Sequence, residues 1–121
     1  RSTSASVPPD TRVSSLVHDW IMGTDERAFL VMDGDRLVGL VCLEDVRKLP
    51  HAQWDNSTVT QIMTPGERLI TTTPQEHAAE ALRKLTRYDV RQLPVMEGNR
   101  LAGLLRLADV VKWLHLYEEM R

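Results

Sequence analysis

Few residues of this sequence have the types and the spacing that catalysis requires. The histidines are scattered, and none has the spacing of a metal-binding motif such as His-Glu-x-x-His: His18, His51, His77 and His115. The single cysteine, Cys42, lies in an apolar stretch without an activating neighbour, which favours a buried, inert thiol. No paired carboxylates and no nucleophile–base arrangement are visible. The chain is therefore predicted not to be an enzyme.

Two aspartates open predicted helices, each three residues after a strand end. Asp45 follows Cys42 and Asp109 follows Arg106 at this spacing. An acidic residue in a first helical turn interacts favourably with the helix dipole and can complete a capping box, so both carboxylates could serve the helix alone. Cys42 and Arg106 are poor N-cap residues, however, which weakens capping as a complete account.

A duplicated stretch positions these aspartates. Residues 31–46 read VMDGDRLVGLVCLEDV and residues 95–110 read VMEGNRLAGLLRLADV, with identity at ten of sixteen positions at an offset of 64. Asp-Gly and Glu-Gly favour a tight turn, so each copy is predicted to be a hairpin followed by a helix. An internal repeat of this kind determines the fold class before any other signal.

Each half reads strand, helix, strand, strand, helix. The first helix is predicted to begin at an Asp10 N-cap and to end near Gly23, and Trp54 is expected to pack back onto the body. Pro74 repeats the helix-introducing role of Pro9 at an offset of 65, one more than in the hairpins. The remaining predicted elements are strands 28–32, 37–42, 69–73, 93–96 and 101–106, a helix from 43 to Pro50, a turn capped by Ser57 or Thr58, and helices 75–87 and 108–120.

The bulk composition narrows the possible partners and locations. A net charge of −2 with scattered basic residues gives no footprint for nucleic acid, which is excluded as a partner. A single cysteine fits a reducing compartment, and no apolar run reaches the roughly 20 residues that span a bilayer. The opening Arg1-Ser2 carries no targeting signal, so we expect the chain to begin inside a longer protein.

Several motifs give the sequence a family resemblance. Ile62-Met63-Thr64-Pro65, Leu93-Pro94-Val95 and the Gly-Leu-(Val/Leu)-x-x-x-Asp stretches at 39–45 and 103–109 resemble a CBS domain pair, or Bateman module. The resemblance implies an α+β fold in which two β-α-β-β-α repeats pack with pseudo-two-fold symmetry. Repeat 1 is placed at residues 1–50, with part of its N-terminal portion missing, the linker at 51–58 and repeat 2 at 59–121.

A narrower resemblance concerns the parent protein. Gly39 to Lys48, Trp54 and the Ile62–Pro65 motif are similar to the CBS tail of bacterial site-2-protease-type zinc metallopeptidases. The resemblance implies a membrane-integral protease whose catalytic domain is absent from this chain, with the module on the reducing, cytoplasmic side.

CBS pairs bind adenosine-containing ligands in the cleft between repeats, so the resemblance implies AMP, ADP, ATP or S-adenosylmethionine. The family signature Gly-h-h-(Thr/Ser)-x-x-Asp, in which h is apolar, uses its hydroxyl for phosphate and its Asp for ribose. Asp45 and Asp109 match the ribose position, whereas Cys42 and Arg106 replace the hydroxyl. Arg106 could supply a charge-assisted phosphate contact or fill the cleft with its bulk.

Further ligand contacts are carried over by position. Ile70 and Thr71 match the strand that contacts adenine, and Arg91 and Arg27 match positions near phosphate. A core or surface role is the alternative for each. The function expected is a regulatory module that controls an attached enzyme and forms a homodimer. The alternative is a ligand-free module that drives dimerisation through the apolar faces of 13–21 and 110–116.

Overall fold

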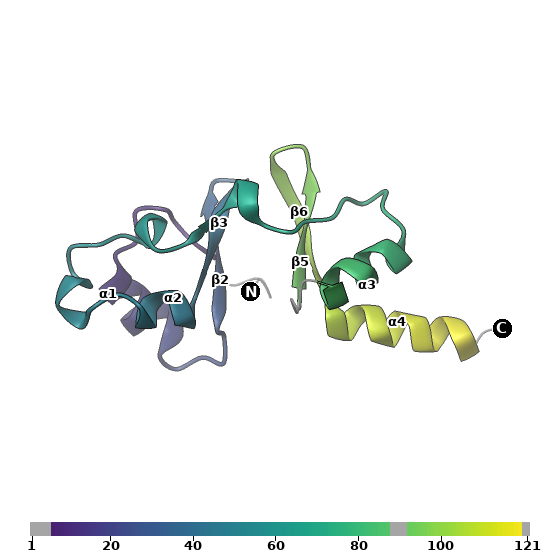
Figure 1. The fold of residues 1–121 in the computed structure, drawn as a ribbon, viewed down its shortest axis with the longest axis horizontal. Coiled ribbons are helices and arrows are strands. Elements are labelled where there is room, and N and C mark those ends of the chain that lie inside the picture. Colours follow the sequence, from purple (N-terminus) through teal and green to yellow (C-terminus); the bar gives the residue numbers. More distant parts are fainter. Residues whose placement is uncertain (1–5, 88–91, 120–121) are drawn as a thin grey trace. The chain divides into compact units, whose positions relative to one another are not determined.

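The chain forms two compact units that divide between Leu69 and Ile70. The computed structural model describes residues 6–87 and 92–119 of the 121, and Figure 1 shows a hairpin with accompanying helices in each unit. The mixture of helices and strands confirms the predicted α+β class. The division lies after the predicted linker because the following segment packs onto the first unit, where Val59 is fully buried. The sequence limits of the two repeats stay a prediction.

Unit 1 is built on an antiparallel hairpin. Strand β2 pairs with β3, β1 adds to β2 in parallel, and β4 pairs antiparallel with β3. Trp54 packs against the buried core, and its indole Nε1 donates to the Leu49 carbonyl at 3.1 Å, which confirms its predicted return to the body. The elements are β1 (Ser6–Val7), α1 (Val13–Ser15), η1 (Leu16–Ile21), β2 (Ala28–Asp33), β3 (Arg36–Cys42), α2 (Leu43–Arg47), η2 (His51–Gln53), η3 (Val59–Gln61), β4 (Thr64–Pro65) and η4 (Gly66–Arg68).

Unit 2 repeats the hairpin and covers it with two longer helices, α3 and α4, which lie side by side (Figure 1). The elements are α3 (Ala78–Arg87), β5 (Gln92–Glu97), β6 (Arg100–Arg106) and α4 (Leu107–Glu119). Its buried cluster draws one or two side chains from each of three elements: Ala81 and Leu85 of α3, Leu93 of β5 and Val110 of α4. Packing between elements, rather than helix propensity, therefore holds α3 and α4 in place.

The duplication extends to the details of the hairpin. Every bound of β5 and β6 lies 64 residues after the matching bound of β2 and β3, and both hairpins have a β-bulge, at Val31/Met32 and at Val95/Met96. Both turns contain a glycine at positive φ, +66° at Gly34 and +64° at Gly98. Because only glycine adopts this region without steric cost, the two Gly residues fix the turns that the sequence predicts.

The start of the first helix differs from the prediction. The N-cap is Arg12 rather than Asp10, and no side chain caps it. Instead the Val13 N–H donates to the Ser57 carbonyl at 2.9 Å, and Arg12 bridges to Thr58. A distant backbone segment therefore satisfies the helix end, which a local capping rule does not anticipate. The helix then continues as a π-helical turn, η1.

The predicted strand at 69–73 is reduced to one bridging residue. The Thr72 N–H donates to the Pro94 carbonyl at 2.9 Å, and the Thr72 carbonyl accepts from the Met96 N–H at 2.8 Å. Residues 73–77 form a turn, so α3 begins at Ala78 instead of Gln75. Thr58 is the N-cap of the turn η3, as predicted, and its N–H donates to Gln61 Oε1 at 2.7 Å. The predicted end of the last helix, Met120, lies outside the described residues.

Candidate functional site

In unit 1 the Asp45 carboxylate is occupied by its own helix. Its Oδ2 accepts the Cys42 backbone N–H at 2.9 Å and the Cys42 Sγ–H at 3.3 Å, and Cys42 is the N-cap of α2. The expectation that Cys42 would cap poorly is therefore wrong in this setting, because the carboxylate at the third helical position supplies the reciprocal bond. A nearby pocket of about 160 Å³, lined by Asp45, Lys48, Leu49 and Ile62, is smaller than most small-molecule sites.

The Cys42 thiol is held in its neutral form. Burial raises its pKa, and the adjacent Asp45 carboxylate adds to the effect because it accepts the Sγ–H and repels a thiolate. Since the thiolate is the reactive species, this environment agrees with the predicted inert thiol rather than with redox chemistry, although Cys42 is half-buried and not buried as predicted.

In unit 2 the matching carboxylate faces a larger pocket. Asp109 is exposed in the first turn of α4, and no hydrogen bond or ion pair joins its carboxylate to another residue of the described ranges. It lines a pocket of about 340 Å³ with Ala78, Leu105, Val110 and Trp113. Four of these five residues are apolar, so the pocket presents hydrophobic walls with a single anionic group. Such a site can hold a flat apolar ring system while the carboxylate accepts hydrogen bonds from hydroxyls.

The other predicted site residues that the structure describes do not line this pocket. Ile70 packs against the buried cluster of unit 2, and the Thr71 carbonyl accepts a bond from Lys84. Arg106 is half-buried and already interacts within the protein. Arg27 is exposed. Its backbone carbonyl accepts a hydrogen bond from the Leu43 N–H at 2.9 Å, so the contact seen for Arg27 involves its backbone and not its side chain. Arg91 lies outside the described residues.

Four pocket residues were missed in the sequence, and two of them, Leu105 and Val110, lie in the duplicated stretch at residues 95–110. Ala78 begins α3, whereas Trp113 lies one helical turn after Asp109 on α4, on the same face. Trp113 is 51% exposed although it is a large apolar side chain. The i, i+4 spacing from a site aspartate to a tryptophan is the signal that could have pointed to it. No local pattern marks Ala78, because a turn and helix from elsewhere in the unit bring it there.

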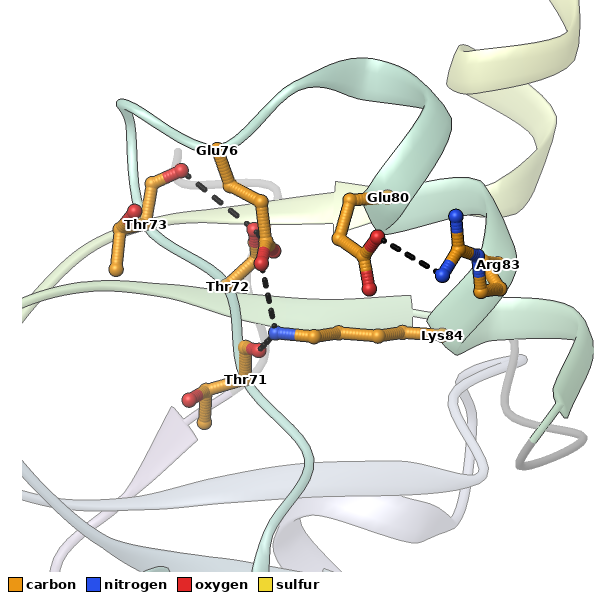
Figure 2. Close-up of polar contacts among 7 residues, drawn as sticks. All are labelled: Thr71, Thr72, Thr73, Glu76, Glu80, Arg83 and Lys84. Atoms are coloured by element: carbon orange, nitrogen blue, oxygen red, sulfur yellow. Dashed lines mark hydrogen bonds and ion pairs between the residues drawn. The ribbon is translucent and has the colours of Figure 1, made fainter.

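A polar network beside this pocket joins the Thr72 segment to α3 (Figure 2). The Thr72 hydroxyl donates to Glu76 Oε1, and Lys84 Nζ lies 3.1 Å from Glu76 Oε2. The same ammonium donates to the Thr71 carbonyl at 2.7 Å. Lys84 and Glu76 side chains are only 27% and 22% exposed, so solvent screens this pair less than a surface ion pair. We call Thr71, Thr72, Glu76 and Lys84 the Lys84 cluster.

The Lys84 cluster makes stability depend on pH in a predictable direction. The Thr72 hydroxyl and then Lys84 lower the pKa of Glu76, so the folded state prefers the carboxylate. A depressed folded pKa stabilises the protein above the ordinary pKa of glutamate, about 4.3, and the contribution is lost as pH falls through the folded value. We expect Glu76→Gln to cost about 1–2 kcal/mol of unfolding free energy at pH 7.

The measurement is urea unfolding of wild type and Glu76→Gln at pH 7, 5, 4 and 3. The difference between the two proteins should shrink towards the acid end, because the wild-type carboxylate becomes protonated there. A difference that stays constant over this range would contradict the assignment of the charged form to the cluster.

Within residues 6–87 and 92–119, no group of three or more His, Cys, Asp or Glu side chains could hold a metal ion. Over the same part of the chain, no helix is both long enough and apolar enough to cross a membrane.

Comparison with known proteins identifies the domain. A family model described as CBS domain matches residues 59–116. A candidate zinc metalloprotease of Synechocystis sp. is 26% identical over 114 residues, which is 92% of this chain and 30% of that protein. The chain therefore spans under a third of the length of this relative.

Solved structures agree on the fold of nearly the whole chain. The CBS domain protein NE2398 superposes with a TM-score of 0.71 at 24% identity, covering 93% of this chain and 88% of that one. The cytosolic domain of the Mg²⁺ channel MgtE, solved in complex with ATP, gives 0.70 at 22% identity over 91% of this chain and 44% of that one.

Proposed function

Because this chain belongs to the CBS-domain family, we propose that it is a non-catalytic regulatory module that binds an adenosine-containing ligand through unit 2. The observation that carries the proposal is the Asp109 carboxylate, which has no partner among the described residues and lines the pocket of about 340 Å³. That volume lies in the usual range of small-molecule sites, about 300–1,000 Å³.

The chemistry of the pocket matches a nucleoside. The apolar walls, with Trp113 and Leu105, suit an adenine ring, since an aromatic side chain offers a stacking surface. A ribose diol can donate two hydrogen bonds to the Asp109 carboxylate, and bonds of a neutral donor to an ionised acceptor are among the stronger ones. Arg106, three residues earlier at the end of β6, does not line the pocket and already interacts within the protein, so it would have to exchange that contact to meet a phosphate.

The two repeats are proposed to differ in their use of this chemistry. The Asp45 carboxylate is engaged with Cys42, and the pocket beside it has less than half the volume of the Asp109 pocket. A ligand diol would have to displace the capping bonds of α2. We therefore assign ligand binding to unit 2 and helix capping to Asp45.

The attached enzyme is proposed to be a site-2-protease-type membrane zinc metallopeptidase. The support is the match of almost the whole chain to the Synechocystis protein, whose remaining length would hold the catalytic part. Ligand occupancy can control such a part only if the ligand binds two states of the module with different affinity.

The experiment is isothermal titration of the chain with AMP, ADP, ATP and S-adenosylmethionine at pH 7. We expect saturable heat with at least one of them, since each contains the adenosine that the pocket fits. The absence of heat with all four would overturn the ligand-binding function.

A second candidate function, dimerisation without ligand, is favoured by one observation. Helix α4 exposes Val111, Trp113 and Leu116, three large apolar side chains on a helix that lies at the surface. Trp113 and Leu116 are three residues apart and share one face of α4, and exposed apolar groups on one face are typical of protein contacts. Light scattering in the same experiment distinguishes the candidates, because a stable dimer that shows no ligand heat supports the structural role.

A further inference from the structure

The Lys84 cluster lies in unit 2 and has no counterpart among the described residues of unit 1. At the offset of 65 that relates the segments before the hairpins, Thr72, Glu76 and Lys84 correspond to Val7, Thr11 and Asp19. The pairing supports this alignment, since Thr72 bridges Val95 in parallel just as Val7 pairs with Val31. The buried Thr72 therefore replaces a valine, and its hydroxyl is satisfied by Glu76.

The cluster holds the turn that delivers one wall of the pocket. Glu76 lies two residues before Ala78, and Ala78 is both the first residue of α3 and a lining residue of the Asp109 pocket. Lys84 reaches back from the middle of α3 to Glu76 and to the Thr71 carbonyl, so the two ends of residues 71–76 are tied to the helix (Figure 2).

The buried cluster of unit 2 does not hold this turn in place. Ala81 and Leu85 bury α3 against Leu93 and Val110, which fixes the helix itself. Between Thr72 and Ala78 the turn exposes Pro74, Gln75 and His77, and its described backbone bond within the turn runs from the Glu76 N–H to the Thr73 carbonyl at 3.2 Å. Glu76 and its partners are thus the main side-chain anchor of this segment, whereas apolar burial holds the helix.

We propose that Lys84 is a positioning residue for the ligand pocket of unit 2. It sets the place of residues 71–78, and with them the Ala78 wall, without touching the ligand itself. This inference rests on the proposed binding of an adenosine-containing ligand at Asp109. A wall held in place before binding spares the ligand the cost of ordering the turn, which is the physical basis of the expected gain in affinity.

Lys84→Met tests the proposal, because methionine keeps the aliphatic stem and removes the ammonium. Titration with AMP and with ATP should show about a tenfold loss of affinity, equivalent to about 1.4 kcal/mol. Lys84→Arg, which retains a donor and a positive charge, should recover most of the loss. Hydrogen exchange should show faster exchange in residues 73–78 of Lys84→Met and weaker protection of them by ligand.

The neighbouring ion pair supplies a matched control. Arg83 Nη1 lies 3.3 Å from Glu80 Oε1 on the same helix, with side chains 67% and 40% exposed (Figure 2). Arg83→Met removes one positive charge at the adjacent position but leaves the turn anchored, so AMP and ATP affinity should be unchanged. Equal losses in both variants would mean a general charge effect and would overturn the positioning role.

The remaining outcomes separate the two proposals. If wild type binds neither AMP nor ATP, the adenosine function is overturned and the positioning role with it. If wild type binds and Lys84→Met binds equally well, the positioning role alone is overturned. Unfolding measurements on each variant show whether lost affinity reflects a lost fold, in which case Lys84→Arg and the exchange pattern of 73–78 decide.

Discussion

Asp109→Ala is expected to weaken binding of an adenosine-containing ligand by about 100-fold while leaving the fold intact. The Asp109 carboxylate is proposed to accept both hydroxyls of a ribose, and bonds to a charged group contribute about 1.5–3 kcal/mol each. Loss of one to two such bonds corresponds to a factor of about 10–10,000 at 1.4 kcal/mol per tenfold, and the expected value of about 100-fold lies within this range. Because Asp109 is exposed and without a described partner, its removal costs the protein little more than a favourable helix-dipole interaction, about 0.3–1 kcal/mol.

The duplication supplies the control for this variant. Asp45→Ala changes the matching residue of the first repeat, where the carboxylate caps α2 through Cys42. It should lower the unfolding free energy by about 1 kcal/mol and leave ligand affinity unchanged. Titration and urea unfolding of both variants are the measurements. If Asp45→Ala lost affinity and Asp109→Ala kept it, the assignment of the two carboxylates would be reversed.

A conservative change separates charge from shape. Asp109→Asn retains the size of the side chain and one carbonyl acceptor but removes the negative charge. An intermediate loss of affinity is expected, since one of the two hydroxyls keeps an acceptor. Full affinity in Asp109→Asn would show that the carboxylate charge contributes nothing to binding.

The hairpins could be read from the sequence because their information is local. The Gly34 and Gly98 turns and ten identities between the copies define both strands, and the structure has them within one residue of the predicted ends at nearly every bound. The helix starts were harder because their partners are distant. The Val13 N–H donates to the carbonyl of Ser57, 44 residues along the chain, whereas capping rules use only residues close to the helix end.

The candidate site also contains residues that could be predicted from local sequence and residues that could not. Asp109 was predicted because it belongs to a motif within one repeat, and the structure leaves its carboxylate available. Ala78 and Lys84 belong to the site only through tertiary packing of a turn and a helix. The place of Cys42 at the N-cap of α2 was missed for a different reason. A statistical preference against cysteine at the N-cap was outweighed by the Asp45 carboxylate three residues on.

Gly39→Ala is expected to destabilise unit 1 by about 2–4 kcal/mol. Gly39 is buried in β3, and a β-carbon there would lie 2.5 Å from the Thr64 carbonyl oxygen and 2.6 Å from Met63 Sδ. The side chain of Met63 can move, but Thr64 presents backbone of β4, which pairs directly with Gly39 and Leu40 of β3. Relief of the contact therefore requires separation of β4 from β3, and overpacking of this kind typically costs about 1–3 kcal/mol before pairing is lost.

Gly103→Ala is the matched variant, 64 residues later in the second copy of the same motif. A β-carbon at Gly103 would meet nothing within 4 Å among the described residues, so no contact opposes it. Alanine also has less conformational freedom to lose than glycine in a strand, and a change between zero and a gain of about 1 kcal/mol is expected. Urea unfolding followed by circular dichroism, with hydrogen exchange resolved for each hairpin, measures both.

The comparison of Gly39 with Gly103 also tests what surrounds the second hairpin in solution. Substitution of two glycines at matching positions of matching strands should change the unfolding free energy by the same amount unless their neighbours differ. The neighbours of Gly39 are Met63 and Thr64. A loss at Gly103→Ala as large as at Gly39→Ala would mean that β6 is covered by a group outside the described residues. A small effect at both positions would contradict the close packing of β4 on β3. The expected result, a large loss at Gly39 alone, ties the identity of this glycine to the backbone of Thr64 rather than to the hairpin motif.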